Sequence, residues 1–473
     1  MTTTNSTTSN RHVTSAFNLR YVWFISLVAA MGGLLFGYDW VVIGGAKPFY
    51  EPYFRLVTPA QIGWAMSSAL IGCLFGAVAS GVLSDKFGRK HLLVVSALLF
   101  TVSSIGTGMA GGFPVFLAWR ICGGVAIGLA SNLSPMYIAE VAPAAVRGQL
   151  VSLNQLTIVI GVLAAQVVNW LIAQPVPSGA TGTDILNSWN GQVGWRWMFG
   201  ATAVPSLLFF LSVLFVPESP RWLAKNGQSG RARTVLARIG GESFAQAELS
   251  EIEATLANEI ARVDFRDLLE PKMVRILALG VFLAVFQQWC GINVVFNYAE
   301  EVFAAAGYHV SDILFNIVVT GVTMFFFTFV AIFTVDRIGR RPLMLLGAAG
   351  LAVCYLALGS SYHFGLRGWP VLGMVIAAVA CYSFSLAPVT WVVLSEIFPN
   401  RIRGAAMAVA VFALWFGCFA LTYSFPFLNS ALGSAGTFWV YCAICVVGSL
   451  VIWRKLPETK DKSLEEIERE LVD

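Results

Sequence analysis

Asp39 and Arg120 are the charged residues whose positions most strongly indicate chemistry, because each lies well inside a long apolar stretch. An unpaired charge is costly in such surroundings, so residues of this kind are usually paired and functional. Burial favours the neutral carboxylic acid, whereas a nearby guanidinium favours the carboxylate. A small change in the distance between the two groups could therefore make Asp39 take up or release a proton. A static structural ion pair is the alternative interpretation.

A second set of charged residues occurs in two copies. The segment SDKFGRK (84–90) recurs as VDRIGRR (335–341), and EVAPAAVRG (140–148) recurs as EIFPNRIRG (396–404). Each copy places acidic residues near basic ones, so these side chains can pair across helix ends. A preference for Lys and Arg on the cytoplasmic side is the alternative, but it does not explain the acidic residues. The residues concerned are Asp85, Arg89, Glu140 and Arg147 in the first copy and Asp336, Arg340, Glu396 and Arg403 in the second.

The composition identifies the kind of protein that carries these residues. The 473 residues are 57% hydrophobic and only 12% charged, whereas about a quarter of an ordinary soluble domain is charged. A soluble fold of this length would lack the charge to cover its surface. The formal net charge of +4 is too mild to indicate nucleic-acid binding, and the eight cysteines lie in apolar runs without the spacing of metal ligands. The chain is therefore an integral membrane protein, for which we expect no disulfide and no metal.

Twelve apolar runs are long enough to cross a hydrocarbon core of roughly 30 Å as helices. The runs are continuous, whereas the strands of a membrane barrel alternate at every second residue. They lie near 20–46, 60–84, 91–110, 113–139, 150–173, 196–216, 272–303, 311–335, 342–362, 369–395, 404–429 and 435–455.

The basic residues predict the orientation of these helices. If the N-terminus is inside, all but five of the 30 Lys and Arg residues are cytoplasmic. Lys47, Arg55, Arg196 and Arg367 then lie outside, and Arg120 lies within a helix. Since positive charge is retained on the cytoplasmic side, both termini are expected there.

The duplicated motifs predict two halves. VPES (216–219) also recurs as LPET (456–459), so three motifs repeat in the same order. Two parallel six-helix repeats, related by an axis along the membrane normal, are expected to enclose a transport pathway. The predicted parts are a disordered cytoplasmic tail (1–18), an N-terminal half (19–216), a cytoplasmic helical linker (217–270), a C-terminal half (271–456) and a cytoplasmic tail (457–473).

An ordered set of motifs gives the chain a family resemblance. It resembles the sugar porter branch of the major facilitator superfamily, close to bacterial xylose–proton symporters and animal glucose facilitators. The motifs span residues 32 to 460. They are GGLLFGYD (32–39), GVLSDKFGRK (81–90), RICGG (120–124), PMYIAEVAPAAVRG (135–148), NQLTIVIG (154–161), PESPRWL (217–223), QQWCGIN (287–293), VDRIGRR (335–341), WVVLSEIFPNRIRG (391–404) and PETK (457–460).

The resemblance implies an all-α major facilitator fold that imports a monosaccharide with a proton by alternating access. It implies that Asp39 carries the proton and Arg120 tunes it. Facilitators typically have asparagine at the position of Asp39, so this aspartate favours symport. The duplicated charges would latch the cytoplasmic side in the outward-open state. An uncoupled sugar facilitator, or a symporter of a polyol such as inositol, is the alternative function.

The same resemblance assigns a substrate cavity. Amide side chains match sugar hydroxyls without a net charge, and tryptophan can stack on the C–H face of a sugar ring. Hydrogen bonds between helices and simple packing are the alternatives. The assigned residues are Gln155, Gln287, Gln288, Asn293, Asn297, Trp391 and Trp415.

Three positions depart from the family pattern. Asn297 stands where an aromatic residue is usual, while Met324 and Leu414 stand where polar residues are usual. These changes should alter which hydroxyls are recognised.

The expected partners are a monosaccharide, a proton and the lipid bilayer. No nucleic acid and no cofactor are expected, and the sequence has no nucleophile elbow, zinc motif or P-loop that would indicate an enzyme. We expect a protein that functions as a monomer in the plasma membrane, typically a bacterial inner membrane.

Overall fold

The computed structural model describes residues 17–177, 179–258, 270–399, 403–460, 462 and 466–467. Every regular element in this part of the chain is helical. Most of the two predicted tails, 1–18 and 457–473, lies outside the described residues.

Six membrane crossings make up the N-terminal half. The last of them is assembled from a π-helical turn and two shorter helices. These elements are α1 (Leu19–Phe54), α2 (Pro59–Phe87), α3 (Arg89–Gly108), α4 (Phe113–Val141), α5 (Ala144–Ile172), and then η1 (Asn190–Gly194), α7 (Trp195–Gly200) and α8 (Ala203–Val213). A short helix, α6 (Gly182–Asn187), precedes η1.

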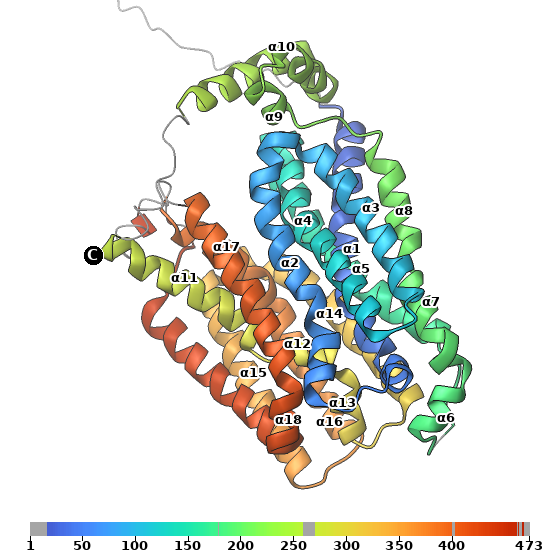
Figure 1. Ribbon diagram of the computed structural model, residues 1–473. Helices are drawn as coiled ribbons and strands as arrows, with labels where there is room; N and C mark the ends of the chain where they lie inside the picture. The colour runs from blue at the N-terminus through green and yellow to red at the C-terminus, as the bar shows by residue number, and fades with distance from the viewer. Residues whose placement is uncertain are drawn as a thin grey trace, which may run out of the picture.

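Two helices, α9 (Pro220–Lys225) and α10 (Ser229–Asn258), connect the halves. The α10 helix bends at Gly241, whose φ is 80°. Glycine adopts positive φ values readily because it has no Cβ atom. Figure 1 shows α9 and α10 together at one end of the bundle, which we call the linker end.

The C-terminal half contains crossings that are broken in the middle. The first consists of α11 (Pro271–Trp289), α12 (Ile292–Asn297) and α13 (Ala299–Ala305). It is followed by α14 (Val310–Ile338), α15 (Arg340–His363), the pair α16 (Trp369–Phe384) and α17 (Leu386–Ile397), and α18 (Arg403–Lys455).

The number of crossings follows from helix length. Eleven helices in the described part of the chain are long and apolar enough to span a membrane. The last of these, α18, has 53 residues, which at about 1.5 Å per residue is far longer than a bilayer core. Its backbone leaves the helical conformation at Gly433, with φ 65°, so α18 forms two crossings. The predicted twelve-helix fold is confirmed.

Close packing between α2 and α4 depends on glycine. A methyl group at Gly72 or Gly76 of α2 would overlap the backbone of α4, and a methyl group at Gly124 or Gly128 would overlap α2. Small residues at every fourth position of each helix let the two backbones approach this closely.

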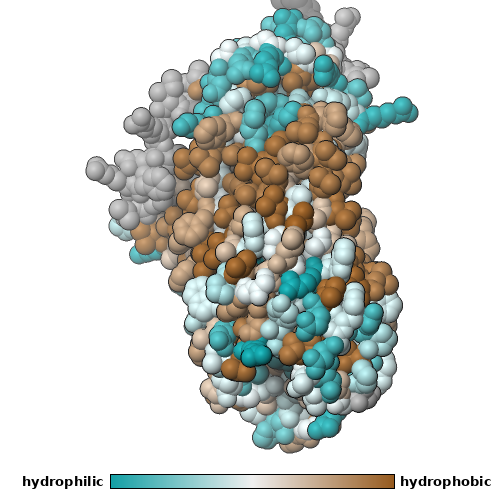
Figure 2. Space-filling view, turned by 45° about the vertical axis from the view of Figure 1, so that its right-hand side comes forward, coloured by the Kyte–Doolittle hydropathy of each residue, from teal (hydrophilic) through white to brown (hydrophobic). Residues whose placement is uncertain are grey.

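The outer surface is suited to lipid. Figure 2 shows a broad hydrophobic band below a hydrophilic linker end, and hydrophilic residues gather again toward the opposite end. Large apolar side chains such as Leu171, Phe215 and Trp453 are more than half exposed. A contiguous apolar surface of this kind is stable against hydrocarbon rather than water.

Candidate functional site

Asp39 and Arg120 form a buried ion pair within the N-terminal half. Nη1 of Arg120, on α4, lies 3.0 Å and 3.1 Å from the two carboxylate oxygens of Asp39, on α1. Only 5% of Asp39 and 3% of Arg120 is exposed. The predicted pairing is confirmed, whereas the proton-coupling role remains a prediction.

The surroundings of Arg120 hold its guanidinium in place but leave one donor unused. The group lies over the ring of Phe199, 5.4 Å from the ring centroid, and Nη2 donates to the carbonyl of Asp39 over 3.4 Å. Its Nε is buried and has no hydrogen-bond partner among the described residues. A buried donor without a partner is costly, so Nε is available for another group.

Three of the predicted substrate residues form one hydrogen-bonded network at the break between α11 and α12. The break is at Gly291, whose φ is 88° and where a side chain would meet Tyr441. Nε2 of Gln288 donates to Oε1 of Gln287 over 3.0 Å, and Nδ2 of Asn293 donates to Oε1 of Gln288 over 2.7 Å. The left-handed glycine thus breaks the helix, and amides on either side of the break contact one another.

The other predicted substrate residues lie on different helices. Trp415 of α18 is buried against Phe36 of α1, with ring centroids 5.7 Å apart. Gln155 on α5 is partly buried, and Trp391 on α17 is 38% exposed. The structure gives these last two no hydrogen bond to the amide network.

Asn297 lines a small cavity that Arg120 of the ion pair also lines. It is 3% exposed, and its buried Oδ1 has no hydrogen-bond partner among the described residues. Asn297 and Arg120 line the same small cavity, together with Trp40, Met66, Ala69, Leu70 and Ile127. The cavity joins a predicted sugar residue of the C-terminal half to the predicted coupling pair of the N-terminal half.

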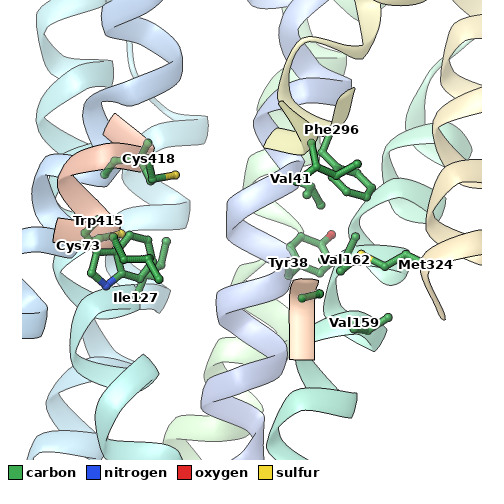
Figure 3. Packing of buried hydrophobic residues seen from close by; sticks show 14 of the residues in the cluster. Tyr38, Val41, Cys73, Ile127, Val159, Val162, Phe296, Met324, Trp415 and Cys418 are labelled. Carbon is green, nitrogen blue, oxygen red and sulfur yellow. The ribbon is translucent and has the colours of Figure 1, made fainter. Parts of the chain in front are cut away.

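The two apolar departures also lie between the halves. Figure 3 shows Met324 of α14 pointing toward Val162 of α5 and Tyr38 of α1. Leu414 is 3% exposed and precedes Trp415, which Figure 3 shows beside Cys73 and Ile127 of the N-terminal half. Apolar side chains therefore occupy both positions where the family pattern has polar ones.

The first copy of the duplicated charges forms ion pairs at the linker end. Nη2 of Arg89 lies 3.0 Å from Oε1 of Glu140, and Nη1 lies 3.3 Å from Asp85. Asp85 is also 2.8 Å from Nζ of Lys225 on α9. Arg147 donates to the carbonyl of Ala142 at the end of α4. These contacts join helix ends within one half.

The second copy repeats this arrangement. Nη2 of Arg340 lies 3.2 Å from Oε1 of Glu396, and Arg403 donates to the carbonyl of Phe398 over 3.1 Å. The side chain of Asp336 lies outside the described residues. In the described contacts, Arg89 and Arg340 each pair with a glutamate of their own half.

The linker helix α10 adds charge beside the first copy. Burial raises the pKa of Glu248 on α10 above its ordinary value, Glu251 raises it further, and Arg147 lowers it.

The glutamates of the VPES and LPET repeats have a role that their recurrence alone did not predict. Oε1 of Glu218 accepts from the backbone N–H of Arg89 over 3.0 Å, at the start of α3. Oε1 of Glu458 accepts from the N–H of Arg340 over 3.0 Å, at the start of α15. A carboxylate at a helix N-terminus satisfies free N–H groups and interacts favourably with the helix dipole. Their recurrence beside the duplicated charges was the available signal.

Two further polar residues were missed. Gln166 of α5 is 2% exposed, and neither amide atom has a partner among the described residues. It lies eleven residues after Gln155, on the same helix face, and that spacing was the available signal. Lys47 of α1 is also only 2% exposed and forms ion pairs with the C-terminal half.

Comparison with known proteins assigns the family. A family model described as "Sugar (and other) transporter" matches residues 25–471. The D-xylose-proton symporter of Escherichia coli K12 is 39% identical over 483 residues, covering 96% of each chain. The arabinose-proton symporter of Bacillus subtilis 168 is 38% identical over 461 residues, covering 97% of each.

A solved structure agrees with these relatives. The inward-open structure of the xylose transporter from E. coli has a TM-score of 0.83 and 37% identity, and the match covers 95% of this chain and 99% of that one. Because the family model matches nearly the whole chain and the relatives exceed a third identity over their full lengths, the chain belongs to the sugar transporter family of the major facilitator superfamily.

Proposed function

We propose that this protein carries a monosaccharide across the membrane together with a proton, by alternating access of its two halves. The observation that carries this proposal is the buried Asp39–Arg120 pair, whose arginine lines a cavity together with Asn297 of the other half. The relatives named above as D-xylose-proton and arabinose-proton symporters support the pentose and proton parts. The reaction is vectorial, since no covalent bond of the sugar is made or broken.

The proton step takes place at the Asp39 carboxylate. Binding one proton converts the carboxylate to a neutral acid and removes the charge that Arg120 contacts. Arg120 can then donate to other acceptors: its Nε has no partner among the described residues, and its side chain lines the cavity shared with Asn297. Movement of the guanidinium would thus link the proton on α1 to α12 in the other half. Inward movement of one proton supplies about 2.3 kcal/mol per 100 mV of membrane potential.

Sugar recognition depends on amides around the α11–α12 break. Gln287, Gln288 and Asn293 already contact one another, so their donors and acceptors are held in a fixed arrangement that can match neighbouring hydroxyls. From the other half, Gln155 and Gln166 of α5 complete the cavity, with Trp391 and Trp415 as apolar walls. Closure of the halves around the sugar then requires ligands from both.

The selectivity follows from the three departures. Met324 and Leu414 present apolar side chains, while Asn297 adds a buried amide. We propose a xylose-like or glucose-like substrate that makes no hydrogen bond at the two apolar positions. An apolar wall discriminates weakly against a missing hydroxyl, whereas a hydrogen-bonding site rejects it strongly.

The linker-end charges act as a latch. Oε2 of Glu140 and of Glu396 and Nη2 of Arg403 are buried and have no hydrogen-bond partner in the part of the chain that the structure describes. These atoms are available for contacts across the two halves when the linker end closes. The duplicated set would then stabilise the outward-open state.

The orientation rests on the distribution of basic residues. We propose that the linker end faces the cytoplasm, with both termini on that side, in the inner membrane of a bacterium. A single chain contains both halves and the whole cavity, so the monomer is the proposed functional unit.

Uptake by proteoliposomes tests this function. Purified protein is reconstituted and presented with labelled xylose, arabinose, glucose, galactose and myo-inositol, with and without an inward pH gradient. Accumulation of a pentose or hexose above its outside concentration only with the gradient is expected. Equal uptake with and without the gradient would instead identify an uncoupled facilitator.

A further inference from the structure

One face of α1, from Phe36 to Lys47, contacts the C-terminal half. Phe36, Trp40, Gly44 and Lys47 follow one another at spacings of four, four and three residues, which places them on one helix face. Phe36 meets Trp415, and Trp40 meets Phe296 of α12 with ring centroids 5.8 Å apart. This face therefore contacts two helices that carry predicted sugar ligands, α12 and α18.

The backbones approach most closely at Gly44. A Cβ atom there would lie 2.7 Å from the carbonyl oxygen of Phe296 and 3.2 Å from that of Asn297. Figure 3 shows Phe296 pointing toward α1 at this level. The absence of a side chain at Gly44 thus allows α12 and α13 to lie directly against α1.

Lys47, one turn beyond Gly44, carries a charge into this contact. Its Nζ lies 3.1 Å from Glu300 and 2.7 Å from Glu301, both on α13 of the C-terminal half. A third carboxylate, that of Glu51 on α1 itself, is 3.0 Å away. The lysine side chain is 3% exposed, whereas those of the two α13 glutamates are 24% and 25% exposed.

The partners of Lys47 differ in what happens when the halves separate. Glu51 is on the same helix and can stay with the ammonium. Glu300 and Glu301 move away with α13, so two of the three ion pairs exist only while this end is closed. Removing one partner of a buried ion pair has a high free-energy cost, because the remaining charge needs water or a new ion-pair partner.

We propose that Lys47 is a positioning residue that holds closed the end of the bundle opposite α10, by pairing with Glu300 and Glu301. This Lys47 latch, at the end opposite the linker-end charges, rests on the alternating-access part of the proposed function. It is independent of the sugar and of the proton site. Glu51 keeps the ammonium oriented while the latch is open. The position thereby sets the balance between the two access states.

Distance measurements between spin labels test the latch directly. Val57 and Phe364 are 82% and 75% exposed. They follow α1 and α15, whose first residues lie at the linker end, so one label on each half reports separation of the opposite end. In the otherwise native protein, reconstituted without sugar, a predominant short distance is expected. In Lys47→Met, the ratio of short to long distances should fall by at least about tenfold.

Matched variants separate this effect from a loss of folding. Glu300→Gln/Glu301→Gln leaves Lys47 with Glu51 and should give the same shift, while Lys47→Arg should keep the short distance. Arg367→Met removes an exposed cation of the C-terminal half at the same end and should change nothing. If Lys47→Met does not fold, the double glutamine variant decides the question.

The outcomes distinguish the latch from the proposed function. An unchanged distance distribution in the folded glutamine variant would overturn the latch, even if sugar uptake is coupled to protons as proposed. A shift to long distances would support the latch, even if no tested sugar is transported.

Discussion

Nη1 of Arg120 bridges both carboxylate oxygens of Asp39, at 3.0 Å and 3.1 Å, in the buried interior of the N-terminal half. The two residues are on α1 and α4, which pack side by side, so the pair does not need the C-terminal half to form. Arg120 also lines the cavity that contains Asn297 of the C-terminal half, and its Nε has no partner among the described residues. A change of charge at Asp39 can therefore be transmitted to the sugar-binding helices.

Removing Arg120 should destabilise the protein in a pH-dependent way. In Arg120→Leu, Asp39 is buried without its cation, and the loss should be about 3–5 kcal/mol when the carboxylate is charged. Because protonation removes that charge, the loss should shrink as the pH falls. Thermal unfolding at about pH 5 and about pH 8 measures this. An equal loss of stability at both pH values would contradict this explanation. In Asp39→Asn/Arg120→Leu, the loss of stability relative to Asp39→Asn should be the same at both pH values.

Removing the charge of Arg89 should shift the conformational balance rather than the sugar site. Arg89→Gln loses the ion pairs with Glu140 and Asp85 that organise the linker end. The inward-open state should gain population and turnover should slow several-fold, while equilibrium sugar binding persists. Label distances across the linker end and binding titrations provide the two readouts. Lost binding with an unchanged distance distribution would argue against a latch.

Gln166 should trade stability for binding. Both of its amide atoms are buried without partners, so Gln166→Met should stabilise the sugar-free protein by about 1–3 kcal/mol. The same change should weaken sugar binding about tenfold or more, since in the proposed site the Gln166 amide forms hydrogen bonds with the sugar. Gln287→Met is the matched control: Gln287 donates to the carbonyls of Leu386 and Ala387, and its removal should lower stability. A Gln166→Met variant that binds sugar normally would remove this residue from the site.

The secondary structure was predictable because it depends on local sequence. Continuous apolar runs correspond to all twelve crossings. The break at Ser385 was not predicted, although Pro388 offers a reason: it has no N–H to bond the carbonyl of Phe384, four residues earlier.

The contacts between segments far apart in the sequence were harder to predict. The Asp39–Arg120 pair was predictable because both charges stand out against apolar surroundings. The pairing of Lys47 with Glu300 joins residues 253 positions apart, and the near-terminal position of each in its helix resembles that of an ordinary surface charge. The helix-capping role of Glu218 was not predicted for a different reason. Its partner is a backbone N–H, and nearly every sequence position has one.

The apolar wall predicts a particular pattern of selectivity. Because Met324 and Leu414 lack hydrogen-bonding groups, one or two single-deoxy sugars should compete almost as well as the parent sugar. Deoxy sugars altered at hydroxyls that face Gln287, Gln288 or Asn293 should lose affinity by about tenfold or more. Competition against labelled substrate across a full set of deoxy analogues measures this. Large and equal losses for every analogue would contradict the proposed wall.

Asp39→Asn tests the central claim, since the amide resembles the protonated acid in shape and hydrogen-bonding capacity but takes up no proton. The purified variant should remain folded, bind sugar and exchange it across the membrane. A structural ion pair predicts instead a destabilised protein, because Arg120 would be left without its carboxylate. Thermal unfolding and binding therefore accompany the transport assay as controls.

The decisive measurement is sugar accumulation by Asp39→Asn in proteoliposomes with an inward pH gradient, compared with the native protein in the same lipid. The account predicts that the native protein concentrates sugar, whereas the variant equilibrates it and stops at equal concentrations. A folded variant that still concentrates sugar with only the proton gradient as driving force would show that the coupled proton binds elsewhere.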